Sequence, residues 1–288
     1  MRRIPAPSGE SETFRLRDAG AAEGGRRLSV EIPPESPLFA GHFPGHPIFP
    51  GIAHLALASR ALREISGEGS LAAVRALKLR RPVAPGEILE LFIGAPAEGG
   101  WRRFELRRGE ELVSGAALQM GLSEKPPWEP KASAEPATME SPPVETLLPH
   151  APPARFIRGI LSSSAEEIVC LAEIPTLHPL VENGSIPTFA GIEAAAQAAA
   201  VLEALNRRGD APGPRIGYLV GVRQARFAAP ALTAGRSLRA TARLQGRAFP
   251  LSIYEIAMGE PDRELVAGTI STFLAGPEDE GTPLTRGG

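Results

Sequence analysis

The sequence predicts an α+β protein made of two similar halves, in each of which an antiparallel sheet curves around one long helix. Three observations lead to this fold class: two alanine-rich helical segments, several runs of alternating apolar and polar residues, and an internal repeat. A long helix followed by an antiparallel meander, found twice, is an α+β arrangement. The length of 288 residues suits about two domains.

Each predicted helix follows a loop rich in proline and glycine. The first is expected over residues 52–65, stopping near Gly67, and the second over residues 189–208, stopping at Gly209. Glycine commonly follows the last residue of a helix. The second helix is so rich in alanine that other backbone can pack closely against it.

The predicted strands show a period of two. Residues 103–107 and 238–244 alternate apolar with charged or polar side chains, with Phe104, Leu106 and Leu238 on the apolar faces. This period is typical of a strand with one buried face. Residues 108–110 and 260–262 are predicted to be hairpin turns.

Two short patterns recur in the same order. Val-Arg at 74–75 precedes Pro82 as Val-Arg at 222–223 precedes Pro230, and Glu-Leu-Val-Ser-Gly at 111–115 answers Glu-Leu-Val-Ala-Gly at 264–268. The two offsets, 148 and 153 residues, differ only by a short insertion. We therefore predict a duplicated domain with diverged copies.

A proline-rich stretch between the copies has neither a helical nor a strand period, so it cannot build a core. The predicted organisation is a first domain over residues 10–122, a linker over 123–145, a second domain over 146–275 and a flexible tail over 276–288.

Composition excludes several classes of function. The net charge of −2 gives no overall field that would favour nucleic acid or an anionic membrane. The single cysteine, Cys170, rules out an intrachain disulfide framework and a cysteine-rich metal site. We expect no signal peptide and no membrane span, hence a cytoplasmic protein.

The strongest local signal is the segment from residue 39 to residue 51, which contains His42, Gly45 and Gly51. Its prolines and glycines impose a rigid loop directly before a helix. Backbone N–H groups of Gly45 and near Gly51 would lie by the positive helix end, where they can polarise a carbonyl or hold an oxyanion. His42 would be a general base near neutral pH. The alternative is a plain turn that carries a surface histidine.

This segment resembles the signature of the beta-hydroxyacyl-(acyl carrier protein) dehydratases of the FabZ/FabA type. That family has the hot-dog fold, and its motif H-F-P-G-x-P-x-x-P-G is complete here from His42 to Gly51. In the family, a catalytic Glu or Asp lies fourteen residues after the histidine; here that position is Ala56. The first half has the histidine and lacks the acid.

The second half shows the reverse. Residues 186–197 resemble the family's helix start, with Glu193 at the acid position and Gln197 one turn later. Residues 147–150 resemble the family's L-L-P-H opening, and we expect His150 to shape that segment. In place of the histidine motif the chain has His178, fifteen residues before Glu193 and without the Pro-Gly pair.

The two defects complement each other. The family builds each active site across a dimer, so the resemblance implies one composite site of His42 and Glu193, and an opposite, weak or dead pairing of His178 with Ala56. A fused pair of this kind resembles the double hot-dog dehydratase domains of polyketide synthases and the paired dehydratases of aryl-polyene pathways.

The function implied by the resemblance is dehydration of a beta-hydroxyacyl thioester to the trans-2-enoyl thioester. His42 would take the alpha proton and Glu193 would protonate the leaving hydroxyl, two roles that are exchangeable at this stage. A carboxyl group among small apolar residues should have a raised pKa, which suits an acid. The remaining expected substrate-binding or oxyanion residues are Phe43, Gly45, Gly51 and Gln197.

The expected partners follow from the same resemblance. The substrate would arrive on the phosphopantetheine of an acyl carrier protein, and basic side chains at a pocket mouth would steer that acidic partner. The candidates are Arg75, Lys78, Arg80, Arg81, Arg223 and Arg226. No metal or redox cofactor is expected, and further homo-oligomerisation of the internal pseudodimer stays open.

Weaker candidates are given structural roles. His42 and His46 have the spacing of a metal pair on a helix, but the prolines between and beside them prevent a helix there. His54 carries no assigned role. Cys170 lies in an apolar strand and is expected to serve packing.

Two other functions compete. One is a hot-dog thioesterase, in which a carboxylate activates water, and the complete H-F-P-G motif speaks against it. The other is a non-catalytic protein that binds acyl chains or acts as a scaffold; the complementary retention of one histidine and one acid weighs against that.

Overall fold

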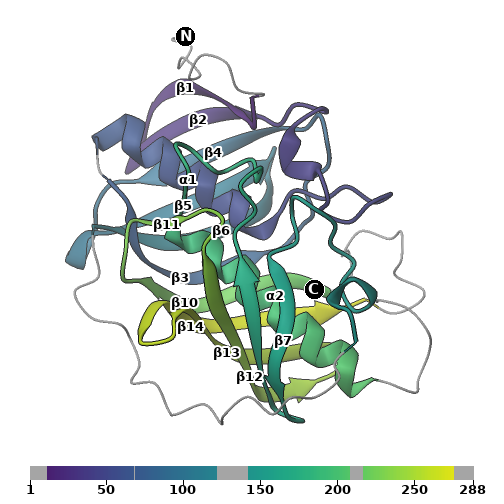
Figure 1. Cartoon of the computed structure of the whole chain (residues 1–288). Helices are drawn as coiled ribbons and strands as arrows, with labels where there is room; N and C mark the ends of the chain where they lie inside the picture. Colours follow the sequence, from purple (N-terminus) through teal and green to yellow (C-terminus); the bar gives the residue numbers. More distant parts are fainter. Residues whose placement is uncertain (1–11, 68, 122–141, 208–216, 276–288) are drawn as a thin grey trace.

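The computed structural model describes residues 12–67, 69–121, 142–207 and 217–275. Two long helices and one twelve-stranded antiparallel sheet form two similar halves, drawn in purple to blue and in teal to yellow in Figure 1. Most of the predicted linker, Gly209 and the predicted tail lie outside the described residues.

The first half contains one α-helix and six strands. Its elements are β1 (Arg15–Ala22), β2 (Gly25–Glu31), the short 3-10 helix η1 (Pro37–Phe39), α1 (Gly51–Ser66), β3 (Leu71–Leu79), β4 (Ile88–Gly94), η2 (Glu98–Gly100), β5 (Trp101–Arg108) and β6 (Glu111–Met120).

The second half repeats this order with additions. Its elements are η3 (Val144–Thr146), β7 (Ile157–Ser163), β8 (Glu167–Glu173), β9 (Ser185–Pro187), η4 (Thr188–Ala190), α2 (Gly191–Asn206), β10 (Gly217–Phe227), β11 (Ala231–Thr233), β12 (Ser237–Ala248), β13 (Leu251–Glu260) and β14 (Arg263–Leu274). Strands β9 and β11 form a separate two-stranded sheet.

The strand order of the large sheet is symmetric about its centre, so that the two halves repeat the same arrangement in opposite directions. Its order is β1-β2-β4-β5-β6-β3 for the first half, continued by β10-β14-β13-β12-β8-β7 for the second. The repeated Val-Arg pairs lie on the two central strands, β3 and β10, which pair antiparallel with Val74 opposite Ala225 and Val222 opposite Leu77. The internal repeat is therefore confirmed as two copies joined edge to edge at this seam.

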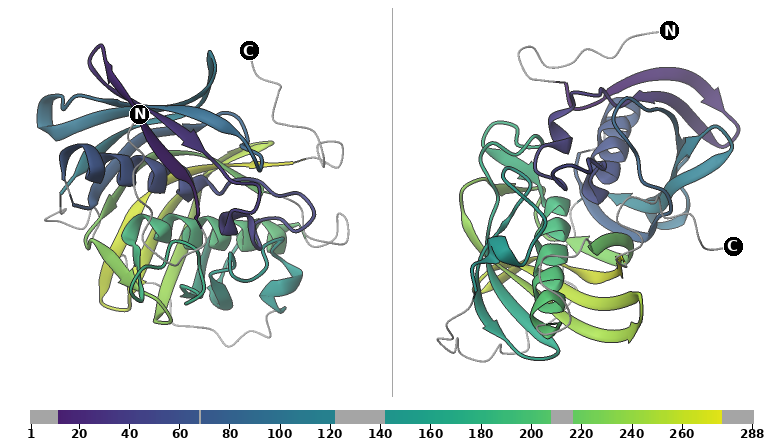
Figure 2. Two further views of the ribbon diagram at one scale, coloured as in Figure 1. Left: turned by 90° about the horizontal axis from the view of Figure 1, so that it is seen from above. Right: turned by 90° about the vertical axis from the view of Figure 1, so that its right-hand side faces the viewer.

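Both helices lie on the inner side of the curved sheet, as two further views show (Figure 2). Leu55, Leu57 and Leu62 of α1 are fully buried, as are Ile192, Val201 and Leu202 of α2. The alternation in β5 and β12 places Phe104, Leu106 and Leu238 in the core, as predicted. This is the double hot-dog architecture that the sequence predicts.

The helix boundaries match the prediction in the first half and differ in the second. Helix α1 ends at Ser66, and Gly67 caps it with a left-handed φ of 66°. Helix α2 begins at Gly191 rather than at Phe189, because residues 188–190 form the 3-10 turn η4, which winds more tightly than an α-helix. The helix ends at Asn206. The described end of the predicted linker also differs, since Val144 starts η3 and is buried in the core.

Among the described residues, one helical segment, Thr188–Asn206, is long and apolar enough to cross a membrane by length and composition, and 72% of its 18-residue apolar window is buried inside the fold. Its apolar character is explained by its position as the central helix of the second half.

Candidate active site

His42 lies in the loop between β2 and α1, and its orientation is fixed. Its Nδ1 donates a hydrogen bond to the backbone carbonyl of Ile48 at 2.8 Å, which leaves the lone pair on Nε2. The side chain is buried, and this burial lowers the pKa of His42 to about 4, while the bond to Ile48 opposes the shift. The imidazole is therefore neutral at pH 7 and able to accept a proton.

Glu193 lies in the first turn of α2 and faces the same space from the other half. Its carboxyl group is buried, which raises its pKa to about 7, although the hydrogen bond from Gln197 works in the opposite direction. Gln197 Nε2 donates to Glu193 Oε1 at 3.0 Å. A carboxyl group that is still partly protonated near neutral pH can act as a proton donor.

Gln197 is itself held rigidly by the segment that opens the second half. Its Oε1 accepts the N–H of Phe156 at 2.8 Å, and its Nε2 also donates to the carbonyl of Ala154 at 2.8 Å. All three contacts are buried, so Gln197 fixes the direction of the Glu193 carboxyl group.

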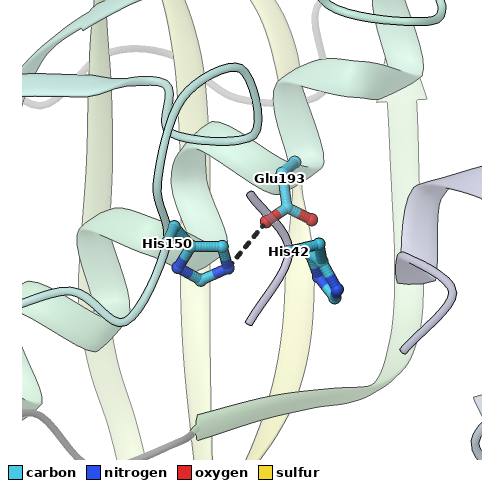
Figure 3. A group of neighbouring side chains, drawn as sticks. All are labelled: His42, His150 and Glu193. Atoms are coloured by element: carbon cyan, nitrogen blue, oxygen red, sulfur yellow. Dashed lines mark ion pairs between the residues drawn. The ribbon is translucent and has the colours of Figure 1, made fainter. Parts of the chain in front are cut away.

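The third member of the cluster, His150, received only a shaping role from the sequence. Its Nε2 lies 3.4 Å from Glu193 Oε1 (Figure 3). Burial holds the pKa of His150 well below its usual value, and repulsion from His42 when that ring is protonated acts in the same direction. Near pH 7 this is therefore a contact of a neutral ring with the carboxyl group. The Nδ1 of His150 is buried and has no hydrogen-bond partner within the described part of the chain.

The close approach of two loops brings His150 to His42. The carbonyl of Gly41 accepts the N–H of Ala151 at 2.9 Å, and the two imidazole rings are 5.4 Å apart between centroids. Gly41 has a φ of +74°, and a Cβ there would lie 2.1 Å from the Ala151 carbonyl oxygen. This contact therefore requires glycine at position 41. The glycine is visible in the sequence, but its reason is the neighbouring loop at Ala151.

The side chains of His42, His150 and Glu193 face a cavity of about 1010 Å³, part of which is open to solvent. Both halves line it, and the alanine face of α2 forms one wall through Ala196, Ala199 and Ala200. Of the expected substrate-binding residues, Phe43, Gly51 and Gln197 line this cavity. A cavity with this apolar wall beside paired polar groups suits an acyl chain.

Gly45 and Gly51 differ in their positions. Gly45 has a φ of +83°, is exposed and does not line the cavity. Gly51 lines the cavity as the first residue of α1, where the N–H groups have no acceptor within the helix. A Cβ on Gly51 would lie 2.9 Å from Leu79 Cδ1 and 3.1 Å from Leu219 Cδ2, so the lack of a side chain also permits close packing against the central strands.

Phe43 supports both imidazoles. Its ring centroid lies 4.3 Å from that of His42 and 4.9 Å from that of His150. Its φ of 62° is uncommon for a residue with a side chain, and such strain is kept where the surrounding structure requires it.

The other expected candidates lie elsewhere or are already engaged. His46 is exposed. His54 is buried at the cavity wall, with its Nδ1 2.9 Å from Ser114 Oγ. Cys170 is buried in β8, which raises its pKa to about 12 and fits a packing role. Arg81 lines the cavity and donates to Glu111, whereas Arg75 stacks on Trp101 at 4.1 Å.

A second hollow of about 590 Å³ occupies the position related to the first by the internal repeat. Its wall includes Ser59 and Arg63 of α1 and Thr188 of η4. Neither His178 nor Ala56 lines it. His178 instead packs on Phe156 with ring centroids 5.1 Å apart and accepts the N–H of Leu180.

We expect Gly41→Ala to lower the activity of this site by about 100-fold, the cost of displacing reacting groups by about 1 Å. The added methyl group meets backbone atoms of the second loop, which cannot rotate away. Gly24→Ala is the matched control, because Gly24 also has a positive φ, of +72°, but nothing within 4 Å of the added atom. Equal activity of the two variants would contradict a role for the loop contact.

Comparison with known proteins finds a dehydratase family in each half. Residues 142–281 match the family model of the ApeP-like proteins, described as ApeP dehydratase, and residues 20–116 match that of the ApeI-like proteins, described as ApeI dehydratase.

Among solved structures, a trans-AT polyketide synthase dehydratase domain from Brevibacillus brevis has a TM-score of 0.64 at 16% identity, over 94% of this chain and 100% of that one. The dehydratase domain from the CurF module of curacin polyketide synthase gives 0.62 at 15%, over 91% and 98%. The chain thus has the fold of the double hot-dog dehydratases.

Curated relatives define the family more narrowly. The 3-hydroxyacyl-(acyl-carrier-protein) dehydratase FabZ of Alkaliphilus metalliredigens is 35% identical over 111 residues, 34% of this chain and 76% of that protein. The FabZ of Symbiobacterium thermophilum is 33% identical over 121 residues, 38% of this chain and 85% of that protein. The chain belongs to the FabZ-type dehydratase family, with its halves similar to ApeI and ApeP.

Proposed function

We propose that this protein dehydrates a beta-hydroxyacyl thioester to the trans-2-enoyl thioester at one composite site made of His42 and Glu193. The observation that supports this most directly is the meeting of the two groups. A ring nitrogen of His42 and a carboxylate oxygen of Glu193 lie within 4.8 Å of each other, although 151 residues separate them in the chain.

The two groups have matched protonation states for this reaction. The neutral Nε2 of His42 accepts the proton from the alpha carbon, and protonated Glu193 donates its proton to the beta hydroxyl, which leaves as water. Histidine is then restored when its proton returns through solvent to the carboxylate. The difference between their pKa values, about 4 and about 7, assigns the base and the acid.

The thioester carbonyl needs a donor while negative charge develops on its oxygen. The N–H of Gly51 is our proposed donor, because it begins α1 and faces the cavity, where the helix dipole also favours negative charge. Gly45 is exposed and lies outside the cavity wall, so we propose that it shapes the loop through its positive φ and does not contact the thioester. Gln197 positions Glu193, and Phe43 packs against the imidazoles.

We further propose a soluble, cytoplasmic enzyme whose substrate is delivered on the phosphopantetheine arm of an acyl carrier protein, with no bound cofactor of its own. Among the basic candidates from the sequence, Arg81 lines the cavity and is our proposed contact for such an acidic partner. The proposed domains remain residues 10–122 and 146–275, with the start of the second moved back to Val144 so that it includes η3.

The test is an assay of the purified chain on a beta-hydroxyacyl carrier-protein thioester, with the loss of water followed by mass spectrometry. Formation of the enoyl thioester would support the proposal. Release of the free acid would indicate a thioesterase instead. A folded protein that turns over none of several acyl chains would point to the acyl-binding or scaffold function.

The pH dependence of kcat/KM follows from the two pKa values. The base must be neutral, so activity rises with pH through about 4, the pKa of His42; the acid must be protonated, so activity falls as pH rises through about 7, the pKa of Glu193. Initial rates measured from pH 4 to pH 9 should therefore follow a bell-shaped profile. A profile that stays flat from pH 6 to pH 9 would argue against Glu193 as the proton donor.

A further inference from the structure

We propose that His42, His150 and Glu193 form a three-ligand site for a zinc ion, and that zinc bound there blocks dehydration. The binding part stands on geometry alone, whereas the blocking part rests on the proposed function.

The three side chains converge from three separate segments. One ligand atom from each residue lies within 4.8 Å of the others, and all three side chains are buried (Figure 3). Zinc ligands at about 2.0–2.1 Å in a tetrahedral site are roughly 3.3 Å apart. His150 Nε2 and Glu193 Oε1, at 3.4 Å, already have this separation, so small side-chain rotations would complete the triangle.

The chemistry of the donor set favours zinc. Two imidazole nitrogens and one carboxylate oxygen suit a borderline metal better than calcium or magnesium, which prefer oxygen ligands throughout. Three protein ligands also leave the fourth position open to the cavity, the pattern of zinc sites that retain an exchangeable water.

Two of the three ligands are oriented by a hydrogen bond with a neighbouring group, as ligands in metal sites usually are. Nδ1 of His42 donates to the carbonyl of Ile48, and Glu193 accepts from Gln197, which directs Nε2 and the carboxylate into the cavity. His150 would bind through Nε2, the atom that faces Glu193. Its Nδ1 is buried and has no hydrogen-bond partner among the described residues, so this ligand lacks the outer contact that the other two have.

Zinc at this position would stop the reaction directly. The metal takes the lone pair of His42 Nε2 and the charge of Glu193, so neither group can accept or donate the proton that dehydration requires. Inhibition should be reversible, and competitive with the acyl thioester, because the metal and the reacting carbons occupy the same end of the cavity.

The experiment is a titration of the tag-free, metal-stripped full chain with Zn²⁺ by calorimetry and with Co²⁺ by visible absorption. We expect one ion per chain and a Co²⁺ spectrum of low-symmetry, four- or five-coordinate type. His150→Gln should weaken the Kd for zinc by at least about 100-fold, since losing a ligand exceeds the 10–100-fold cost of losing an outer contact. Circular dichroism would check that the variant is folded.

Two further variants make the assignment specific. His46→Gln, in the same loop as His42 but exposed, should leave both the Kd for zinc and the enzyme activity unchanged. Glu193→Gln preserves the shape of the side chain and the contact with Gln197 while removing the anionic ligand, so zinc affinity should fall as it does for His150→Gln.

The outcomes separate this inference from the proposed function. No zinc binding to a wild-type chain that dehydrates its substrate would overturn the metal site and leave the function standing. Zinc affinity that is lost in His46→Gln, or kept in both His150→Gln and Glu193→Gln, would also overturn it. Stoichiometric binding that activates the chain would overturn the blocking role.

Discussion

Replacement of His42 by glutamine should reduce kcat/KM for dehydration by about 10³-fold, within the range contributed by a positioned acid or base. Glutamine approximates the size of the imidazole but has no basic nitrogen to accept the alpha proton. Because His42 is the proposed base, the loss should appear in kcat, while binding of the carrier-protein thioester changes little. Steady-state kinetics with a mass-spectrometric readout would measure both terms.

The matched control for this variant is His178→Gln. Both histidines are buried, and burial lowers the pKa of each to about 4, but only His42 lines the main cavity. We expect His178→Gln to keep activity within a few-fold of wild type. A loss as large as that of His42→Gln would mean that the second half contributes a histidine to the chemistry as well.

Replacement of Glu193 by glutamine has the second large expected effect. The amide fills the same volume and can still accept the hydrogen bond from Gln197, but it cannot supply a proton to the leaving hydroxyl. We expect a fall in kcat of about 10²–10³-fold, together with loss of the fall in rate above pH 7. Activity close to wild type would remove Glu193 from the proposed mechanism.

The same variant should be more stable than wild type at alkaline pH. The folded pKa of Glu193, about 7, lies above its ordinary value of 4.5, so the folded state binds more protons than the unfolded state between these values. The stability of wild type therefore falls as pH rises from 4.5 through 7, by at most about 3 kcal/mol from this group.

Thermal unfolding at two pH values tests this. Glu193→Gln should raise the Tm relative to wild type more at pH 8 than at pH 5. An equal difference at both values would show that the carboxyl group is not ionising in a buried environment.

Much of the fold could be predicted because its signals are local. The period of two in residues 103–107 and 238–244, the turn at Gly109 and the cap at Gly67 each depend on neighbours along the chain. The start of α2 could not be predicted in this way. The choice between a 3-10 turn and an α-helix at residues 188–190 depends on how Phe189 and Thr188 pack into the core.

The pairing of His42 with Glu193 was predicted from the resemblance of two motifs to those of a dehydratase family. The structure brings both side chains to one cavity. The position of His150 beside Glu193 and His42 could not be predicted, because nothing near it in the sequence indicates its neighbours. The family-like L-L-P-H opening was the available signal, and it identifies a segment without stating what the histidine contacts.

The sequence by itself determined the duplication, the fold class and the presence of His42 in one half and Glu193 in the other, since each of these follows from residue identity and period. Only the tertiary structure decided that the loops around Gly41 and Ala151 bond to each other, that Gly51 rather than Gly45 borders the cavity, and that His150 completes the cluster. These features depend on contacts across the two halves, where burial sets the pKa values and close backbone approach sets the geometry. Such contacts arise when distant segments pack together, and no local pattern encodes them.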